Sequence, residues 1–303
     1  MSLKITILGS SSATPTKTRN PSAQLLQFNQ KYFLIDCGEG TQMQMLKYGI
    51  KHNRLHHIFI SHLHGDHFLG LYGLLFTFHL FNRQKAVHIY APPELEKMIK
   101  MHIDVAGTTL SYPLHFHPLN IYQQGVILED DTVKVSYFSL KHRIPTFGFL
   151  FQEKPKERRI IKNAIEKYNL SIEDIRKAKK GETVTGHDGK ITPLHLISNE
   201  AAPSYSYAYC SDTAYHKKMI PKIKGTDILY HEATYADDLK ESAEEKYHAT
   251  ARQAALIAKE AGVQKLIIGH FSTRYKSLDI FLKEAKEEFP NTFLAEEGKT
   301  YEI

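Results

Sequence analysis

The sequence has only two cysteines, no long apolar run and no repeated or low-complexity segment. Because Cys37 and Cys210 are too few for a disulfide framework, a reducing compartment is the simplest expectation, and we expect a cytoplasmic protein. No stretch approaches the roughly 20 apolar residues that a membrane-spanning helix needs, so no membrane partner is expected. The first residues, MSLKITILGSSS, run directly into a strand-and-loop pattern, which is not typical of a signal peptide.

The charge of the chain is mildly basic and unevenly distributed. A length of 303 residues suffices for one large domain or two modest ones, and 42% hydrophobic and 24% charged residues are ordinary for a globular protein. The formal net charge is +6, and 11 Lys or Arg against 7 Asp or Glu between Glu153 and Lys190 contribute +4 of it. This stretch indicates either a solvated helical face or a surface for a polyanionic partner.

The hexapeptide HLHGDH at residues 62–67 places four metal-capable side chains within six positions. A short apolar run before it predicts a strand, and a longer apolar run after it predicts a helix, so the hexapeptide lies on a strand-to-helix turn. His62 and His64 point the same way in an extended segment, whereas Asp66 and His67 follow the bend at the intervening glycine. The pattern predicts two adjacent metal ions, and its ligand types suit Zn²⁺, with Mn²⁺ or Fe²⁺ as competitors.

Three further candidate ligands, His142, Asp212 and His270, each follow a run that predicts a strand. Open α/β sheets bind ligands at the carboxyl ends of their strands, so these residues can share one rim with the hexapeptide. His270 considered alone is as readily a buried core histidine, but the joint pattern is harder to explain in that way. In the resulting scheme, His62, His64 and His142 hold one metal, Asp66, His67 and His270 hold the other, and Asp212 bridges both.

A pair of metals about 3.5–4 Å apart acidifies a water between them and stabilises both the attacking and the leaving oxygen of a displacement. The predicted chemistry is therefore hydrolysis. The ligands by themselves leave open whether the substrate is a phosphodiester, an ester or an amide.

The rest of the pattern alternates strands with helices and predicts an α/β fold. After the hexapeptide, residues 68–79 predict one apolar helix. From residue 153 to residue 192 the charge rises, and residues 158–169 and 172–180 predict two short helices. We interpret residues 153–192 as an arm inserted into a single domain that spans residues 1–303.

Together these residues resemble the metallo-β-lactamase superfamily over almost the whole chain and, within it, the short form of the ribonuclease Z family. Four further motifs carry the second resemblance, and generic lactamases or thioesterases of this fold are not expected to have the PxKxRN and HEAT motifs. They are Pro15–Asn20, which matches PxKxRN, Asp36–Gln42, which matches a family turn, His231–Thr234, which matches HEAT, and His270–Tyr275, which matches the last metal motif. The resemblance implies an αββα sandwich with an inserted flexible arm, two zinc ions per subunit and a homodimer.

The resemblance also implies an activity, that of a zinc-dependent endoribonuclease that cleaves the 3′ trailer from precursor tRNA and leaves a 3′-hydroxyl. It implies that Asp66 accepts a proton, that His248 donates one to the leaving 3′-oxygen, and that Glu232 orients His248. It further implies that the arm grips the tRNA elbow through phosphate contacts. The implied substrate contacts are Lys17, Arg19 and Asn20 in the PxKxRN motif and Lys177, Lys179 and Lys180 in the arm.

The sequence departs from the family pattern in two places, and three other functions remain to be weighed. The arm has no Gly-Pro motif, and the family's His-Ser-Thr loop reads His248-Ala249-Thr250 here.

The nearest alternative is another phosphodiesterase of this fold that acts on small phosphodiesters, which would need the metal ligands but not the arm. A redox di-iron protein usually has a carboxylate where His64 stands, so the sequence disfavours it. The third alternative is an RNA-binding module whose metals are only structural.

Overall fold

The computed structural model describes residues 3–28, 30–185 and 191–303. The chain divides into a first unit, Met1–Gln152 with Tyr205–Ile303, and a second unit, Glu153–Ser204. The second unit starts at the residue expected for the arm and continues beyond the expected end at Thr192. Residues 186–190, which belong to the expected arm, lie outside the described residues.

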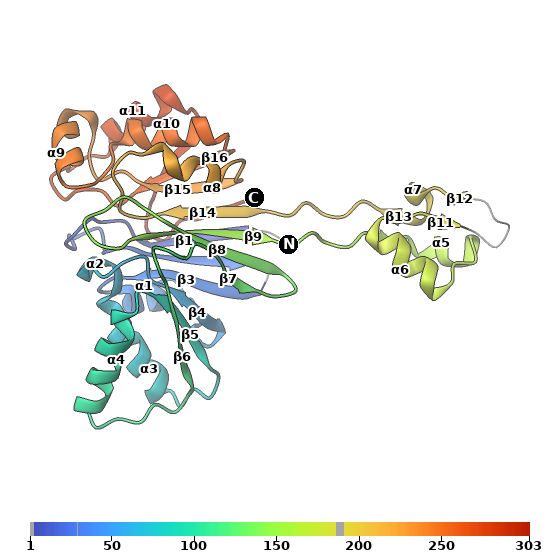
Figure 1. Ribbon diagram of the computed structural model, residues 1–303, viewed down its shortest axis with the longest axis horizontal. Helices are drawn as coiled ribbons and strands as arrows, with labels where there is room; N and C mark the ends of the chain where they lie inside the picture. The colour runs from blue at the N-terminus through green and yellow to red at the C-terminus, as the bar shows by residue number, and fades with distance from the viewer. Residues whose placement is uncertain (1–2, 29, 186–190) are drawn as a thin grey trace. The chain divides into compact units, whose positions relative to one another are not determined.

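Two seven-stranded sheets form the centre of the first unit (Figure 1). The first sheet is antiparallel at one end and parallel at the other, and in the second sheet the strands from Ser206 onwards are parallel to one another. In spatial order the first sheet contains β18 (Thr300–Glu302), β1 (Leu3–Gly9), β2 (Ala23–Phe28), β3 (Lys31–Cys37), β4 (Leu55–Phe59), β5 (Val87–Ala91) and β6 (Leu114–Pro118). The second sheet contains β17 (Thr292–Leu294), β16 (Lys265–Gly269), β15 (Ile228–Glu232), β14 (Ser206–Cys210), β9 (Phe147–Glu153), β8 (Val133–Ser139) and β7 (Gly125–Glu129).

Successive side chains of the first sheet enter two different cores, because neighbouring residues of a strand face opposite sides of the sheet. Phe33 of β3 packs into the core between the two sheets, whereas Leu34 packs into the core beneath the helices. Between the sheets, the rings of Phe59 and Tyr90 stack with centroids 4.4 Å apart, and Phe149 of the second sheet meets Phe59 edge-on at 5.3 Å. Both faces of the first sheet are therefore covered.

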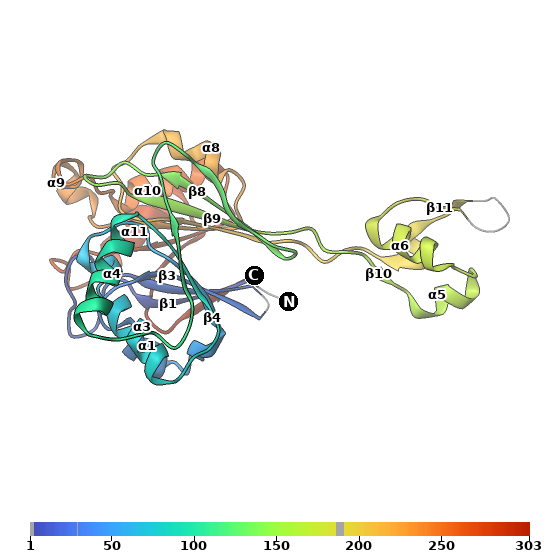
Figure 2. The ribbon, with the colours of Figure 1, turned by 60° about the horizontal axis from the view of Figure 1, so that its bottom comes forward.

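Helices cover the outer faces of both sheets, which gives the first unit four layers in the order α, β, β, α (Figures 1 and 2). The expected αββα sandwich is confirmed. None of the helices among the described residues combines the length and the apolar character that crossing a bilayer requires. The helices of the first unit are α1 (Thr41–Lys47), α2 (Gly65–Phe68), α3 (Gly70–Leu80), α4 (Glu94–Val105), α8 (Ile220–Ile223), α9 (Lys240–Glu245), α10 (Ala251–Ala261) and α11 (Asp279–Glu288).

The single helix predicted over residues 68–79 is wrong in its start and its continuity, because the structure has α2 and α3 there, separated at Leu69. Close backbone packing accompanies the break: a Cβ on Gly70 would lie only 2.1 Å from the carbonyl oxygen of Gly38. The start of α3 is thereby held against the turn that follows β3. This contact joins segments distant in sequence, so a local apolar pattern does not reveal it.

The second unit has its own small core, formed by Ala164, Leu170, Ala178, Val184 and Ile197. The helix predicted over residues 172–180 is confirmed, and Ser171 with Asp174 forms a capping box at its start. The helix predicted over residues 158–169 is present as α5, but its predicted start is wrong, because Arg159–Ile160 pairs as a strand with Ser198–Asn199. The elements of this unit are β10 (Arg159–Ile160), α5 (Lys162–Lys167), α6 (Ile172–Lys180), β11 (Val184–Thr185), β12 (Ile191–Thr192), α7 (Leu194–Ile197) and β13 (Ser198–Asn199).

Candidate metal centre

The seven expected ligands all lie in segments that follow strands, and the structure brings them together at one edge of the first unit. The hexapeptide follows β4, His142 follows β8, Asp212 follows β14 and His270 follows β16. Although His67 and His270 are 203 positions apart in sequence, their Nε2 atoms lie 3.3 Å from each other. The ligand atoms form two groups that share Asp212.

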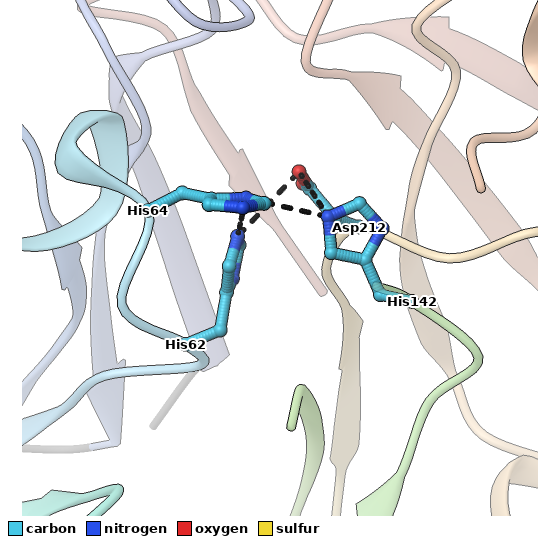
Figure 3. Close-up of side chains that lie close together, drawn as sticks. All are labelled: His62, His64, His142 and Asp212. Carbon is cyan, nitrogen blue, oxygen red and sulfur yellow. Dashed lines mark hydrogen bonds and ion pairs between the residues drawn. The ribbon is translucent and has the colours of Figure 1, made fainter. Parts of the chain in front are cut away.

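The first group consists of His62, His64, His142 and Asp212 (Figure 3). His64 Nδ1 lies 3.0 Å from His62 Nε2 and 3.3 Å from His142 Nε2. Asp212 Oδ2 lies 3.6 Å from His62 Nε2 and 3.8 Å from His142 Nε2. The three rings and the carboxylate therefore point toward one common centre.

The second group consists of Asp66, His67 and His270, together with the other oxygen of Asp212. His67 Nε2 lies 3.5 Å from Asp66 Oδ2 and 3.4 Å from Asp212 Oδ1. His270 Nε2 lies 3.3 Å from each of the same two oxygens. Asp212 thus directs Oδ2 toward the first group and Oδ1 toward the second, as a bridging ligand would.

The dimensions of the second group fit a tetrahedral metal ion. Bonds of about 2.0–2.1 Å to such an ion require donor atoms about 3.3–3.4 Å apart, and the recorded donor–donor distances are 3.3–3.5 Å. Asp212 Oδ1 is buried and accepts no hydrogen bond from the described residues. Such a buried oxygen is costly unless a cation pairs with it. The residues present therefore fit a divalent cation.

Hydrogen bonds on the outer side of the rings determine which nitrogen faces the centre. His67 Nδ1 donates to Asp36 Oδ2 at 2.8 Å, so its Nε2 is unprotonated when the ring is neutral. The hydroxyl of Thr234 donates to Glu232 at 2.8 Å and therefore accepts from His270 Nδ1, which lies 2.9 Å away. In this state the two Nε2 atoms face each other with their lone pairs. They repel unless a cation lies between them.

Asp36 begins the family turn Asp36–Gln42, but the sequence predicted no role for its side chain. It is fully buried and accepts hydrogen bonds from the amide and the hydroxyl of Ser61 at 2.7 and 2.9 Å and from Tyr209 Oη at 2.6 Å, in addition to that from His67. Its carboxylate orients a ligand rather than binding the metal itself. The available signal was its position, since Asp36 is the next-to-last residue of β3 and Asp212 comes shortly after the end of β14.

Four residues around the centre have a positive φ although they are not glycine. This conformation costs an L-residue about 1–2 kcal/mol, and such strain gathers at functional sites. Two of these strained residues make backbone contacts to expected ligands: the Ala13 amide donates to Asp66 Oδ2 at 2.8 Å, and the Tyr247 carbonyl accepts from His142 Nδ1 at 2.9 Å. The four residues are Ala13 (61°), Asp36 (55°), Tyr247 (59°) and His270 (61°).

The buried carboxylates make the centre a place where positive charge is stabilised. Burial by itself lowers the pKa of His67, but Asp66, Asp212 and Asp36 outweigh burial and raise that pKa well above its usual range. At His62 burial prevails, and the pKa lies well below its usual range. A divalent cation would supply the positive charge that a proton on His67 otherwise provides.

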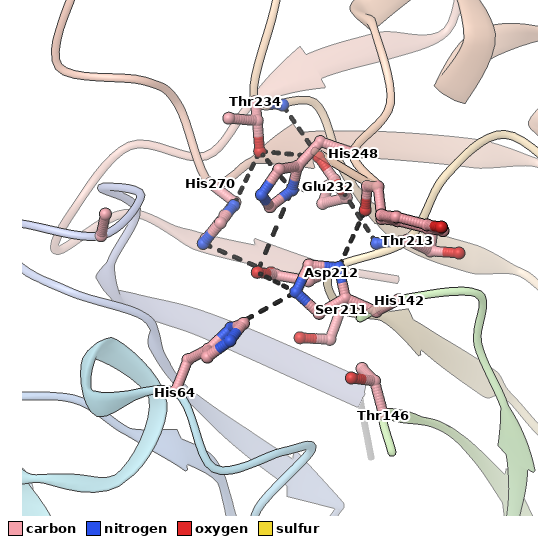
Figure 4. A network of polar contacts seen from close by, with 12 residues as sticks. His64, His142, Thr146, Ser211, Asp212, Thr213, Glu232, Thr234, His248 and His270 are labelled. Carbon is pink, nitrogen blue, oxygen red and sulfur yellow. Dashed lines mark hydrogen bonds and ion pairs between the residues drawn. The ribbon is translucent and has the colours of Figure 1, made fainter. Parts of the chain in front are cut away.

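A second polar pair, Glu232 and His248, lies beside the ligand groups (Figure 4). His248 Nδ1 donates to Glu232 Oε1 at 2.8 Å, and the amides of Thr213 and Thr234 donate to the same carboxylate at 2.9 Å each. Burial lowers the pKa of His248, but the Glu232 carboxylate outweighs burial and raises that pKa to about 9. Although His248 Nδ1 lies 4.0 Å from Asp212, it holds its proton toward Glu232, so we do not assign it as a metal ligand.

A cavity of about 350 Å³ opens onto the ligand groups and onto His248. Arg143 also lines this cavity, is exposed, and has no recorded ion pair within the described ranges. Arg143 was not among the residues predicted from the sequence, although it directly follows the expected ligand His142. A guanidinium at this position can bind a phosphate of the substrate.

The PxKxRN loop has one free cation and two residues with structural partners. The Arg19 guanidinium donates to the carbonyls of Ser272 and Tyr275 at 3.4 and 3.3 Å. The amide and the side chain of Asn20 donate to Glu297 at 2.6 and 2.8 Å. Lys17 is exposed without a recorded partner in the described part of the chain, and Lys17 and Arg19 both line a cavity of about 680 Å³.

The three arm lysines of α6 are all at the surface of the second unit. Lys177 pairs with Glu173 at 2.8 Å and Lys179 with Glu157 at 3.5 Å. No ion pair is recorded for Lys180 among residues whose positions the structure gives. Exposed pairs of this kind contribute at most about 1 kcal/mol, so they do not prevent phosphate contacts.

Comparisons with known proteins identify the family. Residues 3–155 match the family model described as Anti-Pycsar protein Apyc1. A curated ribonuclease Z from Cytophaga hutchinsonii is 45% identical over 304 residues, which cover 100% of this chain and 97% of the relative. The crystal structure of the human short-form tRNase Z is 27% identical with a TM-score of 0.73 and covers 98% of both chains. The metallo-β-lactamase fold protein YhfI from Bacillus subtilis has a TM-score of 0.72 at 19% identity over 100% of both chains, which shows the fold alone. The chain therefore belongs to the ribonuclease Z family, with the metallo-β-lactamase fold, and its first half also belongs to the family of the Apyc1 model.

Proposed function

We propose that this protein is a metal-dependent endoribonuclease that removes the 3′ trailer of precursor tRNA and leaves a 3′-hydroxyl on the tRNA. The observation that carries the proposal is the placement of Asp212, whose two oxygens join two ligand groups beside the Glu232–His248 pair. Such a centre suits hydrolysis of a phosphodiester. Membership of the ribonuclease Z family supports tRNA as the substrate.

For the metals we propose two zinc ions per subunit, with Mn²⁺ or Fe²⁺ as competitors. Imidazole and carboxylate ligands at tetrahedral spacing favour zinc. When bound, the ions supply Lewis-acid stabilisation of phosphate charge and acidify a water. Metal analysis of protein purified without added metal tests this assignment, and stoichiometric iron in place of zinc would refute it.

In the proposed reaction, Asp66 accepts a proton from the attacking water, and His248 donates one to the leaving 3′-oxygen. The recorded contacts of the Asp66 carboxylate all go to Oδ2, which leaves Oδ1 for the proton. Although burial opposes it, His67 and His270 hold the pKa of Asp66 well below its usual range, so Asp66 passes the proton on to solvent in the cavity. The raised pKa of His248 keeps that ring protonated at neutral pH, as a general acid requires.

The first experiment is incubation with a precursor tRNA that carries a 3′ trailer, with the cut mapped and its dependence on zinc measured. The proposal expects one cut that leaves a 3′-hydroxyl on the tRNA. Asp212→Ala should abolish cleavage and leave tRNA binding largely intact, because Asp212 contacts the metals rather than the tRNA body. If the wild-type protein binds tRNA with metals present but never cleaves it, the metals are structural and the proposal fails.

We propose that the second unit is the arm that binds tRNA, through Lys177, Lys179 and Lys180. The chain enters this unit from β9 and returns from it into β14. These two strands are paired neighbours in the second sheet, with Gln152 opposite Ser206. Residues 154–204 can therefore be replaced by the turn Asn-Gly, which closes a two-residue β-hairpin. Cleavage of precursor tRNA should collapse in this variant while the metal content stays at the wild-type level. The matched control keeps the unit and changes only the three lysines to glutamine, which should weaken tRNA binding and its dependence on salt.

The hairpin variant also separates the proposal from the alternative of a hydrolase for small phosphodiesters. All ligands and the Glu232–His248 pair belong to the first unit, so hydrolysis of bis(p-nitrophenyl) phosphate should survive removal of the second unit. If the intact protein hydrolyses only such small esters and leaves precursor tRNA uncut, the alternative is correct.

We also propose a homodimer, in which a second copy covers an apolar face of the first unit. Exposed apolar side chains gather on three helices of one layer: Met43 and Leu46 on α1, Leu80 beside Phe81 at the end of α3, and Met101 with Val105 on α4. Leu46→Asp with Phe81→Asp should shift the mass measured by light scattering from dimer to monomer. Val126→Asp, which changes an exposed apolar residue on β7, is the control and should leave the dimer intact.

We propose a cytoplasmic location for the protein. Cys37 and Cys210 are both buried and unpaired, which suits a reducing compartment. Cell fractionation tests this location, and recovery in an oxidising compartment would contradict it.

A further inference from the structure

Two buried serines directly precede expected metal ligands, and neither has a role in the function proposed above. Ser61 comes shortly after β4 of the first sheet and is followed by His62. Ser211 comes directly after β14 of the second sheet and is followed by Asp212. The two hydroxyl oxygens lie 2.9 Å from each other, so the two sheets are in polar contact directly behind the candidate ligands.

The backbone of Ser61 is also held by both sheets. Its amide donates to Asp36 Oδ1 at 2.7 Å, near the end of β3 in the first sheet. Its carbonyl accepts from the amide of Phe147, the first residue of β9 in the second sheet, at 3.0 Å. The position of the Ser61 hydroxyl is therefore determined by segments of both sheets.

The hydroxyl of Ser61 has three partners, and the charge of one of them determines the direction of all three hydrogen bonds. Because the Asp36 carboxylate accepts only, the hydroxyl donates its one proton to Oδ2 at 2.9 Å. The Ser61 oxygen then accepts from His62 Nδ1 at 3.0 Å and from the hydroxyl of Ser211 at 2.9 Å. A hydroxyl has one proton and two lone pairs, so this side chain uses its whole hydrogen-bonding capacity.

This arrangement orients a ligand of the first group. Because His62 Nδ1 donates to Ser61, Nε2 of the neutral ring is unprotonated and directs its lone pair toward the other ligands of that group. An imidazole must have this tautomer to bind a metal, and a partner on its outer nitrogen is what selects the tautomer. Among the described residues, Ser61 is the only recorded partner of His62 Nδ1.

The same hydroxyl is connected to the second group through Asp36. Asp36 Oδ2 accepts from both Ser61 and His67, so Ser61 helps to hold the carboxylate that orients His67. His67 Nδ1 also lies 3.5 Å from the Ser61 oxygen, but this distance is too long to compete with its bond of 2.8 Å to Asp36. The third partner, Ser211, adjoins Asp212, whose two oxygens face the two groups.

We propose that Ser61 is a positioning residue that couples the two metal sites. Its hydroxyl selects the tautomer of His62 in the first group and supports the carboxylate that orients His67 in the second. This inference rests on the metal centre proposed above, but not on tRNA as the substrate. Loss of this one hydroxyl should therefore weaken the binding of both metal ions.

Competition with a chromophoric chelator, starting from the metal-loaded protein, measures the two dissociation steps. Ser61→Ala should weaken both steps about 10-fold to 100-fold, as the loss of a residue that orients metal ligands typically does. Ser22→Ala is the matched control, because this serine is also buried and its hydroxyl has no recorded hydrogen-bond partner among the described residues. The control should leave both dissociation steps unchanged.

Proton NMR of the metal-loaded protein gives a second measurement, which a purely structural role of Ser61 would not affect. The Nδ1 proton of His62 should give a downfield resonance in the wild type, because it is buried and hydrogen-bonded. In Ser61→Ala this proton loses its acceptor, so the resonance should move upfield or disappear through exchange with water. In Ser22→Ala it should stay in place.

If Ser61→Ala does not fold, Ser211→Ala is the second variant. It removes one of the three hydrogen bonds of the Ser61 hydroxyl and should weaken metal binding about fivefold. Unchanged affinity in a folded variant, weakening of only one dissociation step by Ser61→Ala, or an equal effect of Ser22→Ala would overturn the coupling. A wild-type protein that binds no divalent metal would refute the metal centre itself, and this inference with it.

Discussion

Replacing Glu232 with glutamine should move the alkaline limit of cleavage to lower pH, because Glu232 raises the pKa of His248. A general acid works only while protonated, so the rate is present below the pKa of His248 and is lost as the pH rises through it. In the wild type that pKa is raised from 6.5 to about 9, and the Glu232 carboxylate is the largest of the groups that raise it. Without that charge, burial remains, and burial lowers the pKa.

The size of the effect follows from these values. At pH 8 a pKa of about 9 leaves about 90% of His248 protonated, whereas a pKa of 6.5 leaves about 3%. At pH 6 the two values leave nearly 100% and about 75%. The ratio of wild-type to variant rate should therefore be about 20-fold larger at pH 8 than at pH 6. Bound cations lower the pKa in both proteins, so the displacement between the two profiles is the quantity to measure.

Single-turnover cleavage of precursor tRNA between pH 5.5 and pH 9.5 gives both profiles, with metal content measured at each pH. Glutamine places an amide among the N–H groups of Thr213 and Thr234 and thereby lowers stability, but a smaller folded fraction scales the profile without moving it. His248→Gln should be slow throughout and lack the alkaline limit. A Glu232→Gln profile that is parallel to the wild type at every pH would refute the role assigned to this pair.

Three further changes have outcomes that the structure determines. Asp36→Asn removes the charge that orients His67 and should weaken metal binding about 10-fold to 100-fold in competition with a chromophoric chelator; unchanged affinity would contradict the role of Asp36. Arg143→Gln should raise KM for precursor tRNA about tenfold, whereas Lys141→Gln, which removes an equal charge outside the cavity, should not; equal effects would show that only net charge matters. Phe59→Ala should lower the free energy of unfolding by about 3–5 kcal/mol in urea titrations, because Phe59 fills the core between the sheets; a loss below about 1 kcal/mol would mean that this core collapses around the cavity.

The confirmed predictions are those whose signal lies within a few neighbouring residues. Helix α6 was predictable at both ends because its capping box and the glycine that follows it are local. The fold class was predictable because strands and helices that alternate along the chain indicate an α/β fold. The family was predictable because its motifs are short and local. Arg159–Ile160 was mistaken for helix because its pairing partner, Ser198–Asn199, lies about 40 positions away.

In the candidate site, too, the residues with a local sequence signal were predictable and the others were not. The residue types in the hexapeptide indicate metal ligands, because imidazole and carboxylate side chains seldom lie so close together in a sequence unless they bind a metal. The partners that orient them are ordinary residues, such as the backbone of Ala13 and of Tyr247, and they have no sequence signature. Arg19 and Asn20 stand in a motif that suggests substrate contacts, yet they bond to neighbouring segments of the chain, which only the folded structure reveals.

The sequence by itself determined the candidate ligands, the α/β class, the family and the place of the inserted unit, since each depends on the kind and spacing of nearby residues. The tertiary structure alone decided which oxygen of Asp212 faces which ligand group and that Asp36 accepts a hydrogen bond from His67. These features are distances between residues far apart in the chain. Such distances depend on how two whole sheets pack against each other.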